Sequence, residues 1–488
     1  MPFISELAAM RAESRAGRVM LLSCGPVASA VFSTGLVFLI SWNFKPEILG
    51  SIAILELTAV FFTMALTFGC DQAYVREFAS EKDKAALLAN AFRVPTFATV
   101  AAVALLLVFL LIWEIEIIPQ AGIAGTILAV GYAAGALIIR LLSTVLRMSE
   151  RLLALAVLQA TQRVVTLVLV TAVVVLTDVR QLMIVLSCYL LAVLVSVALH
   201  IFALRGELIE ASRRQFHWEG AERLLRFGIP AGLAAILYAL LASSDRLALA
   251  FWGSVRDLGI YMVAQSIAAI LTIFTSIFAI IWAPFVYQSV AREKDESSYT
   301  PYVEAIVFAS FACAGTISAL AWFLPILFPA DYDQLARYVP ACMALPLFYL
   351  LAETYGVGLG VSRRMDVAFT ISGGGAAVAL ALSFLLVPQF GVAGAALGIL
   401  LGSLVFLIGR AELAARIWYR LPSQKMYFAV TLFTLGAALS LALGSVFQTW
   451  LMMYWVGFLI ALFAMFRARL LLVSSLARQA YLQLSGPK

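Results

Sequence analysis

Five ionisable side chains stand in stretches of this sequence that are otherwise apolar enough to cross a membrane. Asp245 and Arg246 are adjacent in one such run, Arg163 and Glu353 stand near the middle of two others, and Glu56 lies near the outer end of a fourth. A charge in hydrocarbon costs at least about 2.5–3.5 kcal/mol, so such a residue is expected to face protein or a water-filled path. These five positions are therefore the first candidates for chemistry.

The types of these side chains predict two kinds of chemistry. Guanidinium groups match phosphate in a bidentate manner, so Arg163 and Arg246 could hold an anionic substrate group. Carboxylates removed from water could carry a coupling proton or sodium ion, which makes Glu353, Glu56 and Asp245 candidates for ion coupling or gating. The alternatives are structural: a packing ion pair or snorkelling for Asp245–Arg246, and a packing role for Glu56 near the surface.

The composition indicates that the elements that position these residues lie in a membrane and not in water. Of the 488 residues, 64% are hydrophobic and 12% are charged, whereas a soluble domain carries about 25% charged residues. A membrane span needs about 20 apolar residues, and the sequence contains fourteen such runs. They begin near Val19, Ser51, Val94, Ile123, Leu152, Leu182, Ile229, Gly259, Val303, Met343, Val367, Val392, Met426 and Trp450. We therefore predict an all-α integral membrane protein with fourteen transmembrane helices.

The placement of basic residues supports this count. With the N-terminus in the cytoplasm, 27 of the 33 Lys and Arg residues fall on inside segments. Four fall on outside loops, namely Lys45, Arg180, Arg256 and Arg337, and Arg163 and Arg246 remain within spans. This asymmetry follows the positive-inside rule and explains the net charge of +6 without nucleic acid. It predicts that both termini are cytoplasmic.

Neither an enzyme site nor a metal site is indicated. The sequence has no nucleophile–base arrangement, metal-ligand spacing or nucleotide loop, and the outside loops are short. The five cysteines are isolated and read as small buried apolar side chains, and His200 and His217 do not form a cluster. No cleavable signal peptide is evident. Active transport would then depend on an ion gradient, on membrane potential or on the gradient of the substrate.

The two halves of the sequence resemble each other. Glu47-Ile48-Leu49-Gly50-Ser51 corresponds to Arg256-Asp257-Leu258-Gly259-Ile260, and Gly25-Pro26 corresponds to Gly228-Ile229-Pro230. The repeated spans cross in the same direction, so the repeat is a pseudo-twofold along the membrane normal with six spans per lobe. We predict an N-lobe at 1–204, a cytoplasmic linker at 205–227, a C-lobe at 228–415, and two additional spans with a tail at 416–488.

Glycine and proline mark the packing and the moving parts of such a fold. Gly391, Gly394, Gly398 and Gly402 share one helical face, as do Gly131 and Gly135, and we interpret these rows as close helix packing. Paired Gly-Pro interruptions point to the central site of a transporter. Alternatively, each proline occupies the first turn of its helix, where it is harmless.

Several stretches together resemble the Wzx-type O-antigen flippases, which belong to the superfamily that also holds multidrug antiporters and lipid II flippases. The stretches are Gly69-Cys70-Asp71-Gln72-Ala73-Tyr74-Val75-Arg76-Glu77-Phe78, Ser244-Asp245-Arg246, Leu258-Gly259-Ile260-Tyr261-Met262-Val263-Ala264, Ile281-Trp282-Ala283-Pro284-Phe285 and Gly391-Val392-Ala393-Gly394-Ala395-Ala396. The similarity covers essentially the whole chain.

The resemblance implies a function and a substrate. It implies a protein of the bacterial inner membrane that moves an undecaprenyl-diphosphate-linked oligosaccharide to the periplasmic leaflet by alternating access. We expect a monomer, because each half supplies the packing partner of the other, and we expect polysaccharide-assembly proteins as partners. No cofactor is expected apart from a coupling H⁺ or Na⁺. The expected substrate-binding residues, for diphosphate or acidic sugars, are Arg163, Arg246, Arg140, Gln159 and Gln162.

Two other classes remain as alternatives. A cation-coupled multidrug antiporter has the same kind of span arrangement. A glycan polymerase or ligase is disfavoured because the largest outside loop, 329–341, is short and holds a single arginine, Arg337.

Overall fold

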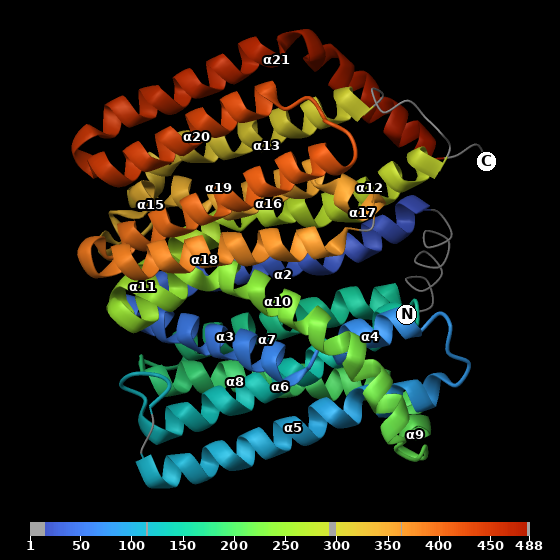
Figure 1. Cartoon of the computed structure of the whole chain (residues 1–488). Helices are drawn as coiled ribbons and strands as arrows, with labels where there is room; N and C mark the ends of the chain where they lie inside the picture. The colour runs from blue at the N-terminus through green and yellow to red at the C-terminus, as the bar shows by residue number, and fades with distance from the viewer. Residues whose placement is uncertain (1–14, 114–115, 292–298, 363, 486–488) are drawn as a thin grey trace. The chain divides into compact units, whose positions relative to one another are not determined.

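The protein was analysed as a computed structural model, which describes residues 15–113, 116–291, 299–362 and 364–485. Over these residues the regular elements are all helices, and none is a strand (Figure 1). The chain divides into two compact units, Cys24–Ser243 and the residues from Ser244 onward, with the described residues before Cys24 grouped with the latter. We call them the N-terminal unit and the C-terminal unit.

The N-terminal unit is built around α6, which packs against α3, α7 and α8. Its helices, with α2 and α10 shared between the units, are α2 Arg15–Asn43, α3 Pro46–Leu66, α4 Cys70–Glu77, α5 Lys84–Trp113, α6 Gly122–Met148, α7 Leu152–Leu176, α8 Leu182–Ala203, α9 Arg205–Ser212 and α10 Trp218–Trp252.

The C-terminal unit is built around α15, α16 and α19, and α13 packs against α21. Its helices are α11 Val255–Ala268, α12 Ile270–Ala291, α13 Thr300–Leu320, η2 Ala321–Phe323, α14 Leu324–Leu327, η3 Ala330–Tyr332, α15 Leu335–Cys342, α16 Ala344–Tyr355, α17 Val357–Val361, α18 Met365–Phe390, α19 Val392–Ile417, α20 Gln424–Leu443, η4 Gly444–Phe447 and α21 Gln448–Ser485.

The fourteen predicted spans each have a helical counterpart. Among the described residues, 13 helices are long and apolar enough to cross a membrane. The remaining predicted span, which was expected to begin near Gly259, corresponds to α11 and α12, and these meet at Ala269. The prediction of an all-α integral membrane protein is therefore confirmed.

The two repeated prolines lie inside helices and not at their first turns. Pro26 lies well within α2, which begins at Arg15, and Pro230 lies well within α10, which begins at Trp218. The first-turn alternative is wrong because both helices begin before their apolar runs. Each proline therefore removes one hydrogen bond from a helix interior, where it favours a kink.

The other glycines of the two rows act in helix packing, as the sequence predicted, whereas a Cβ added at Gly391 would meet nothing within 4 Å. A Cβ added at Gly394, Gly398 or Gly402 of α19 would come within 2.3 Å of atoms in α18. In α6, a Cβ added at Gly135 would lie 2.1 Å from a Val193 side-chain atom in α8. The α18–α19 hairpin itself turns at Gly391, where φ is +54°, a value that other residues rarely adopt.

The linker is fixed to the N-terminal unit. Arg223 binds Glu81 at 2.8 Å, Arg214 binds Asp83 at 3.2 Å, and Arg93 donates to the Arg214 carbonyl at 2.6 Å. The hydrogen bond from Arg223 lowers the pKa of the exposed Glu81 carboxyl. These interactions agree with the boundary between the two units, which falls inside α10. The lobe boundaries at 204 and 228 remain predictions.

Candidate functional site

An ion pair lies halfway along two helices of the N-terminal unit. Glu56 is the central residue of α3 and Arg163 lies near the centre of α7. The Nη1 atom of Arg163 donates to Oε1 of Glu56 at 2.6 Å, and the side chains are 24% and 19% exposed, respectively. Glu56 lies deeper than the sequence indicated because α3 begins at Pro46 and not near Ser51. The pair is thus central, partly accessible and charged.

Polar side chains surround this pair. Gln162 donates to the Tyr132 hydroxyl at 3.1 Å, and the Tyr132 ring lies 6.2 Å from the Tyr189 ring, centroid to centroid. Gln159 lies one turn from Arg163 on α7 and close to α2, because a Cβ added at Gly25 would lie 2.4 Å from its Oε1. The structure therefore brings Glu56 of α3 to Arg163 and Tyr132 of α6 to Gln162, while Gln159 on the same helix, α7, lies toward α2.

Arg140 belongs to a separate pair in the same unit. Its Nε and Nη2 atoms donate to Oδ2 of Asp71 at 3.0 and 2.8 Å, and Gln72 donates to the same oxygen at 3.1 Å. Asp71 is 3% exposed, whereas the Arg140 side chain is 29% exposed. This pair joins α4 to α6, and Arg140 lies about two turns before the end of α6.

The neighbouring loop explains why the Gly69-Cys70-Asp71 stretch begins with glycine. Gly69 has φ of +64°, and a Cβ there would lie 1.9 Å from the Gly228 carbonyl oxygen of α10. Any other residue would have to displace backbone. The two glycine motifs of the N-terminal unit are therefore in direct contact, which holds Asp71 in place.

Asp245 is the acceptor in a buried cluster of the C-terminal unit. It is 1% exposed, and its Oδ2 atom accepts from the Tyr261 hydroxyl at 2.6 Å and from Gln265 Nε2 at 2.7 Å. Its Oδ1 atom accepts the backbone N–H of Arg246 at 2.7 Å. The carboxylate thus ties the end of α10 to α11, while the side chain of Arg246 is half-buried.

Glu353 pairs with an arginine that sequence reasoning had counted among inside segments. Arg410 of α19 donates from Nη2 to Oε1 of Glu353 at 3.0 Å. The helical segment that carries Glu353 begins at Leu335 and ends at Tyr355, so Glu353 lies near the end of that segment and not at its middle. The cause is that the helix begins before the apolar run at Met343. The depth of Glu353 in the membrane stays a prediction.

Sequence reasoning missed the partners of its candidates. Asp71, Tyr261 and Gln265 stand in or beside the stretches that carried the family resemblance, so their place in those stretches was an available signal. Arg410 had no such signal, because only the packing of α16 against α19 brings it to Glu353. Among the described residues no group of three or more His, Cys, Asp or Glu side chains could hold a metal ion.

Solved structures place this fold in a known class of membrane protein. The structure is similar to that of the lipid II flippase MurJ in an inward closed conformation, with a TM-score of 0.67, 11% identity, and coverage of 92% of this chain and 99% of that chain. It is also similar to a multidrug resistance MATE family transporter. For the inward-facing form the TM-score is 0.59 at 15% identity, covering 82% of this chain and 97% of that one. For the outward-facing form the values are 0.56, 17%, 82% and 95%.

The sequence identifies the family more narrowly. Residues 19–290, more than half of the chain, match the model of the family described as polysaccharide biosynthesis protein. The chain therefore belongs to the polysaccharide biosynthesis protein family, and it has the fold of a flippase and of multidrug transporters. A comparison with curated protein sequences found no match.

Proposed function

We propose that the protein is a Wzx-type flippase of the bacterial inner membrane, with both termini in the cytoplasm. It moves an undecaprenyl-diphosphate-linked oligosaccharide repeat unit from the cytoplasmic to the periplasmic leaflet by alternating access. The family supports a role in polysaccharide assembly, and the fold supports transport. The observation that supports a mechanism is the Glu56–Arg163 ion pair, which lies in the middle of α3 and α7.

The pair suits an exchange of counter-ions. An unpaired Arg163 at this depth would be costly, and Glu56 neutralises it at 2.6 Å. When a proton or a sodium ion occupies Glu56, its charge is cancelled and Arg163 requires another anion. A guanidinium has five N–H donors and matches phosphate oxygens in a bidentate manner. Arg163 then takes the diphosphate or an acidic sugar of the substrate.

This exchange couples the two ligands. Each favours the binding of the other, because the cation on Glu56 releases Arg163 and the anion on Arg163 compensates the cation. Such a coupling is reciprocal and is typically worth about 1–3 kcal/mol. Gln159 and Gln162 supply neutral hydrogen bonds to the same group. Arg140 and Arg246 lie outside this cluster, and their contact with substrate remains a prediction.

Complementation of a flippase-null strain tests the proposal. We expect Arg163→Ala to abolish surface polysaccharide and to leave lipid-linked oligosaccharide on the cytoplasmic side, when strains are compared at equal amounts of folded protein in the membrane. Arg147→Ala, which changes an exposed arginine on α6, is the matched control and should complement fully. Normal surface polysaccharide in Arg163→Ala would overturn the proposed role. Restoration of drug efflux without polysaccharide would favour the antiporter alternative.

A further inference from the structure

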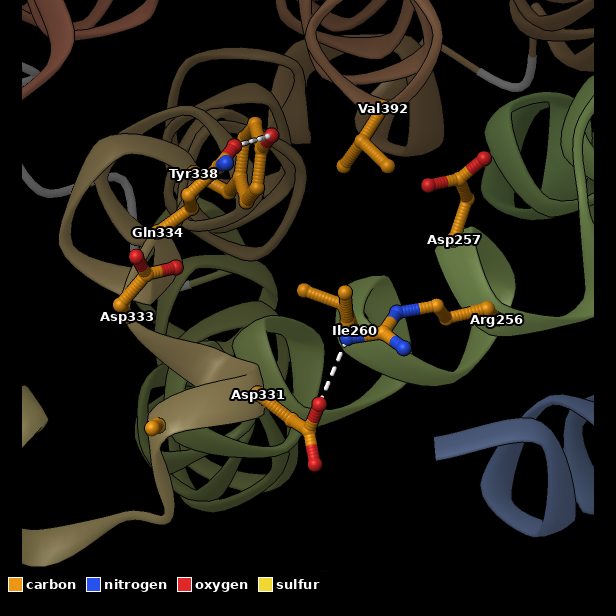
Figure 2. A pocket seen from close by; sticks show the side chains of 9 residues that line it. Arg256, Asp257, Ile260, Asp331, Asp333, Gln334, Tyr338 and Val392 are labelled. Carbon is orange, nitrogen blue, oxygen red and sulfur yellow. Dashed lines mark hydrogen bonds and ion pairs between the residues drawn. The ribbon is translucent and has the colours of Figure 1, made fainter. Parts of the chain in front are cut away.

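A pocket of about 480 Å³ opens in the C-terminal unit where three helices begin. Arg256 and Asp257 come from the first turn of α11, Asp331 and Asp333 from η3 and the residue after it, and Gln334 and Tyr338 from the start of α15 (Figure 2). Val392, the first residue of α19, lies on the same pocket. Arg256 is one of the few basic residues that the charge count places outside.

Two of the three acidic residues of this pocket already have structural roles. Asp257 forms a capping box with Ser254 at the start of α11, and Asp331 binds Arg256 at 2.6 Å. Acidic side chains near helix N-termini compensate the partial positive charge of the backbone there. Asp257 thus compensates the N-terminus of α11 and Asp331 is paired with a guanidinium, so the pocket is closer to electrical balance than its three carboxylates alone indicate.

The remaining groups provide hydrogen-bond donors, acceptors and apolar surface. The Tyr338 hydroxyl donates to Gln334 Oε1 at 2.8 Å, which orients the Gln334 amide nitrogen as a donor. Asp333 is an exposed carboxylate acceptor, and Ile260 and Val392 add apolar surface. Figure 2 shows Ile260 between the Arg256–Asp331 pair and the Gln334–Tyr338 pair. Donors and acceptors thus surround an apolar patch.

We propose that this pocket binds a neutral sugar ring. A pyranose has hydroxyl groups around its edge and an apolar C–H face, and both surfaces have counterparts in the pocket. The volume of about 480 Å³ lies within the range of about 300–1,000 Å³ that is usual for small-ligand sites. The proposal adds a glycan subsite in the C-terminal unit to the anion site in the N-terminal unit, and it requires no transport.

The test is sugar binding by the full chain in lipid nanodiscs. Saturation-transfer NMR would measure methyl glucoside, glucosamine and glucuronate as neutral, cationic and anionic probes. We expect saturable transfer to methyl glucoside, with glucosamine and glucuronate no stronger. Removing one hydrogen bond in Gln334→Ala should weaken binding about fivefold. Asp178→Asn, an exposed carboxylate in the N-terminal unit, is the control and should bind methyl glucoside as the unchanged chain does.

Three outcomes would overturn the inference. They are no transfer to methyl glucoside, binding that Gln334→Ala leaves unchanged, and clearly stronger binding of glucosamine, which would make the pocket a cation site. Gln334 is exposed, so its substitution should not unfold the chain, and an unchanged unfolding temperature confirms this. If methyl glucoside binds through Gln334 while the chain fails to complement a flippase-null strain, the proposed function fails and this inference stands.

Discussion

The helix that contains the shared Leu-Gly motif carries a polar residue at the same step in both units, but the two residues have different partners. Counting from Leu49-Gly50 and from Leu258-Gly259 places Glu56 of α3 opposite Gln265 of α11. Glu56 pairs with Arg163, and both side chains are partly exposed. Gln265 donates to Asp245, which is 1% exposed and also accepts from Tyr261. The N-terminal unit thus has a partly exposed ion pair at this position. At the corresponding position, the C-terminal unit has a buried carboxylate that accepts hydrogen bonds from neutral donors.

Equivalent joints elsewhere also differ in charge. Past the second repeated span, Tyr74-Val75-Arg76 corresponds to Phe285-Val286-Tyr287, and this local register places Asp71 opposite Trp282. Asp71 joins α4 to α6 by an ion pair with Arg140, whereas Trp282 joins α12 to α16 by donating its Nε1–H to the Thr354 carbonyl at 3.2 Å. The two units therefore have corresponding helices, but different interactions join these helices in each unit.

The difference divides the candidates by role. A partly exposed ion pair can exchange partners, because solvent and ligands reach it. A buried carboxylate that accepts three hydrogen bonds is costly to disturb, since each donor would lose its partner. We therefore infer that ion and anion exchange occurs in the N-terminal unit and that Asp245 holds the C-terminal unit together.

Breaking the pair from one side should have the largest effect on stability. Arg163→Ala leaves Glu56 uncompensated, and we expect a loss of about 3 kcal/mol in the free energy of unfolding, since a fully buried pair would lose about 3–5 kcal/mol. The double change Glu56→Gln/Arg163→Gln should recover most of it. Denaturant unfolding in detergent would measure both, and a double variant as unstable as the single one would contradict the pairing.

Disturbing the buried cluster should affect stability and leave transport intact. Asp245→Asn retains one acceptor oxygen but presents an amide NH₂ where a donor now points, which we expect to cost about 1–3 kcal/mol. Lipid-linked oligosaccharide transport per folded molecule should not change. If transport fell while the unfolding temperature stayed constant, Asp245 would belong to the transport site and the division of roles would be wrong.

Breaking the ion pair between Glu81 and the linker residue Arg223 should have the smallest effect on the free energy of unfolding. The lowered pKa of Glu81 means that its pair with Arg223 contributes stability above the ordinary pKa of a glutamate, and that this contribution is lost as the pH falls through the lowered pKa. Surface pairs are worth at most about 1 kcal/mol. Unfolding of Arg223→Ala and the unchanged chain should differ slightly at neutral pH and converge in acid. A difference that persists in acid would argue against the ion pair.

The sequence predicted the helices well and their polar contacts poorly. Apolar runs and the distribution of Lys and Arg report on the membrane. Thirteen of the fourteen predicted spans therefore match helices long and apolar enough to cross it, and the span near Gly259 matches the shorter α11 and α12. Helix ends depend on residues outside the apolar runs, such as Pro46 before the run at Ser51. Glu56 and Glu353 therefore lie at other places along their helices than the apolar runs indicated.

Partners such as Arg410 for Glu353 depend on which helices pack together. A single sequence does not encode that packing in any local pattern. The exception is a residue such as Asp71, which stands inside a recognisable stretch and was therefore available as a candidate.

The most direct test of the division of roles is ion-coupled transport by two single variants in proteoliposomes. Flux of lipid-linked oligosaccharide would be measured with and without an imposed H⁺ or Na⁺ gradient, at equal amounts of folded protein. The account predicts that flux through Glu56→Gln no longer responds to either gradient, while Asp245→Asn responds as the unchanged chain does. A gradient response that survives in Glu56→Gln and is lost in Asp245→Asn would contradict it.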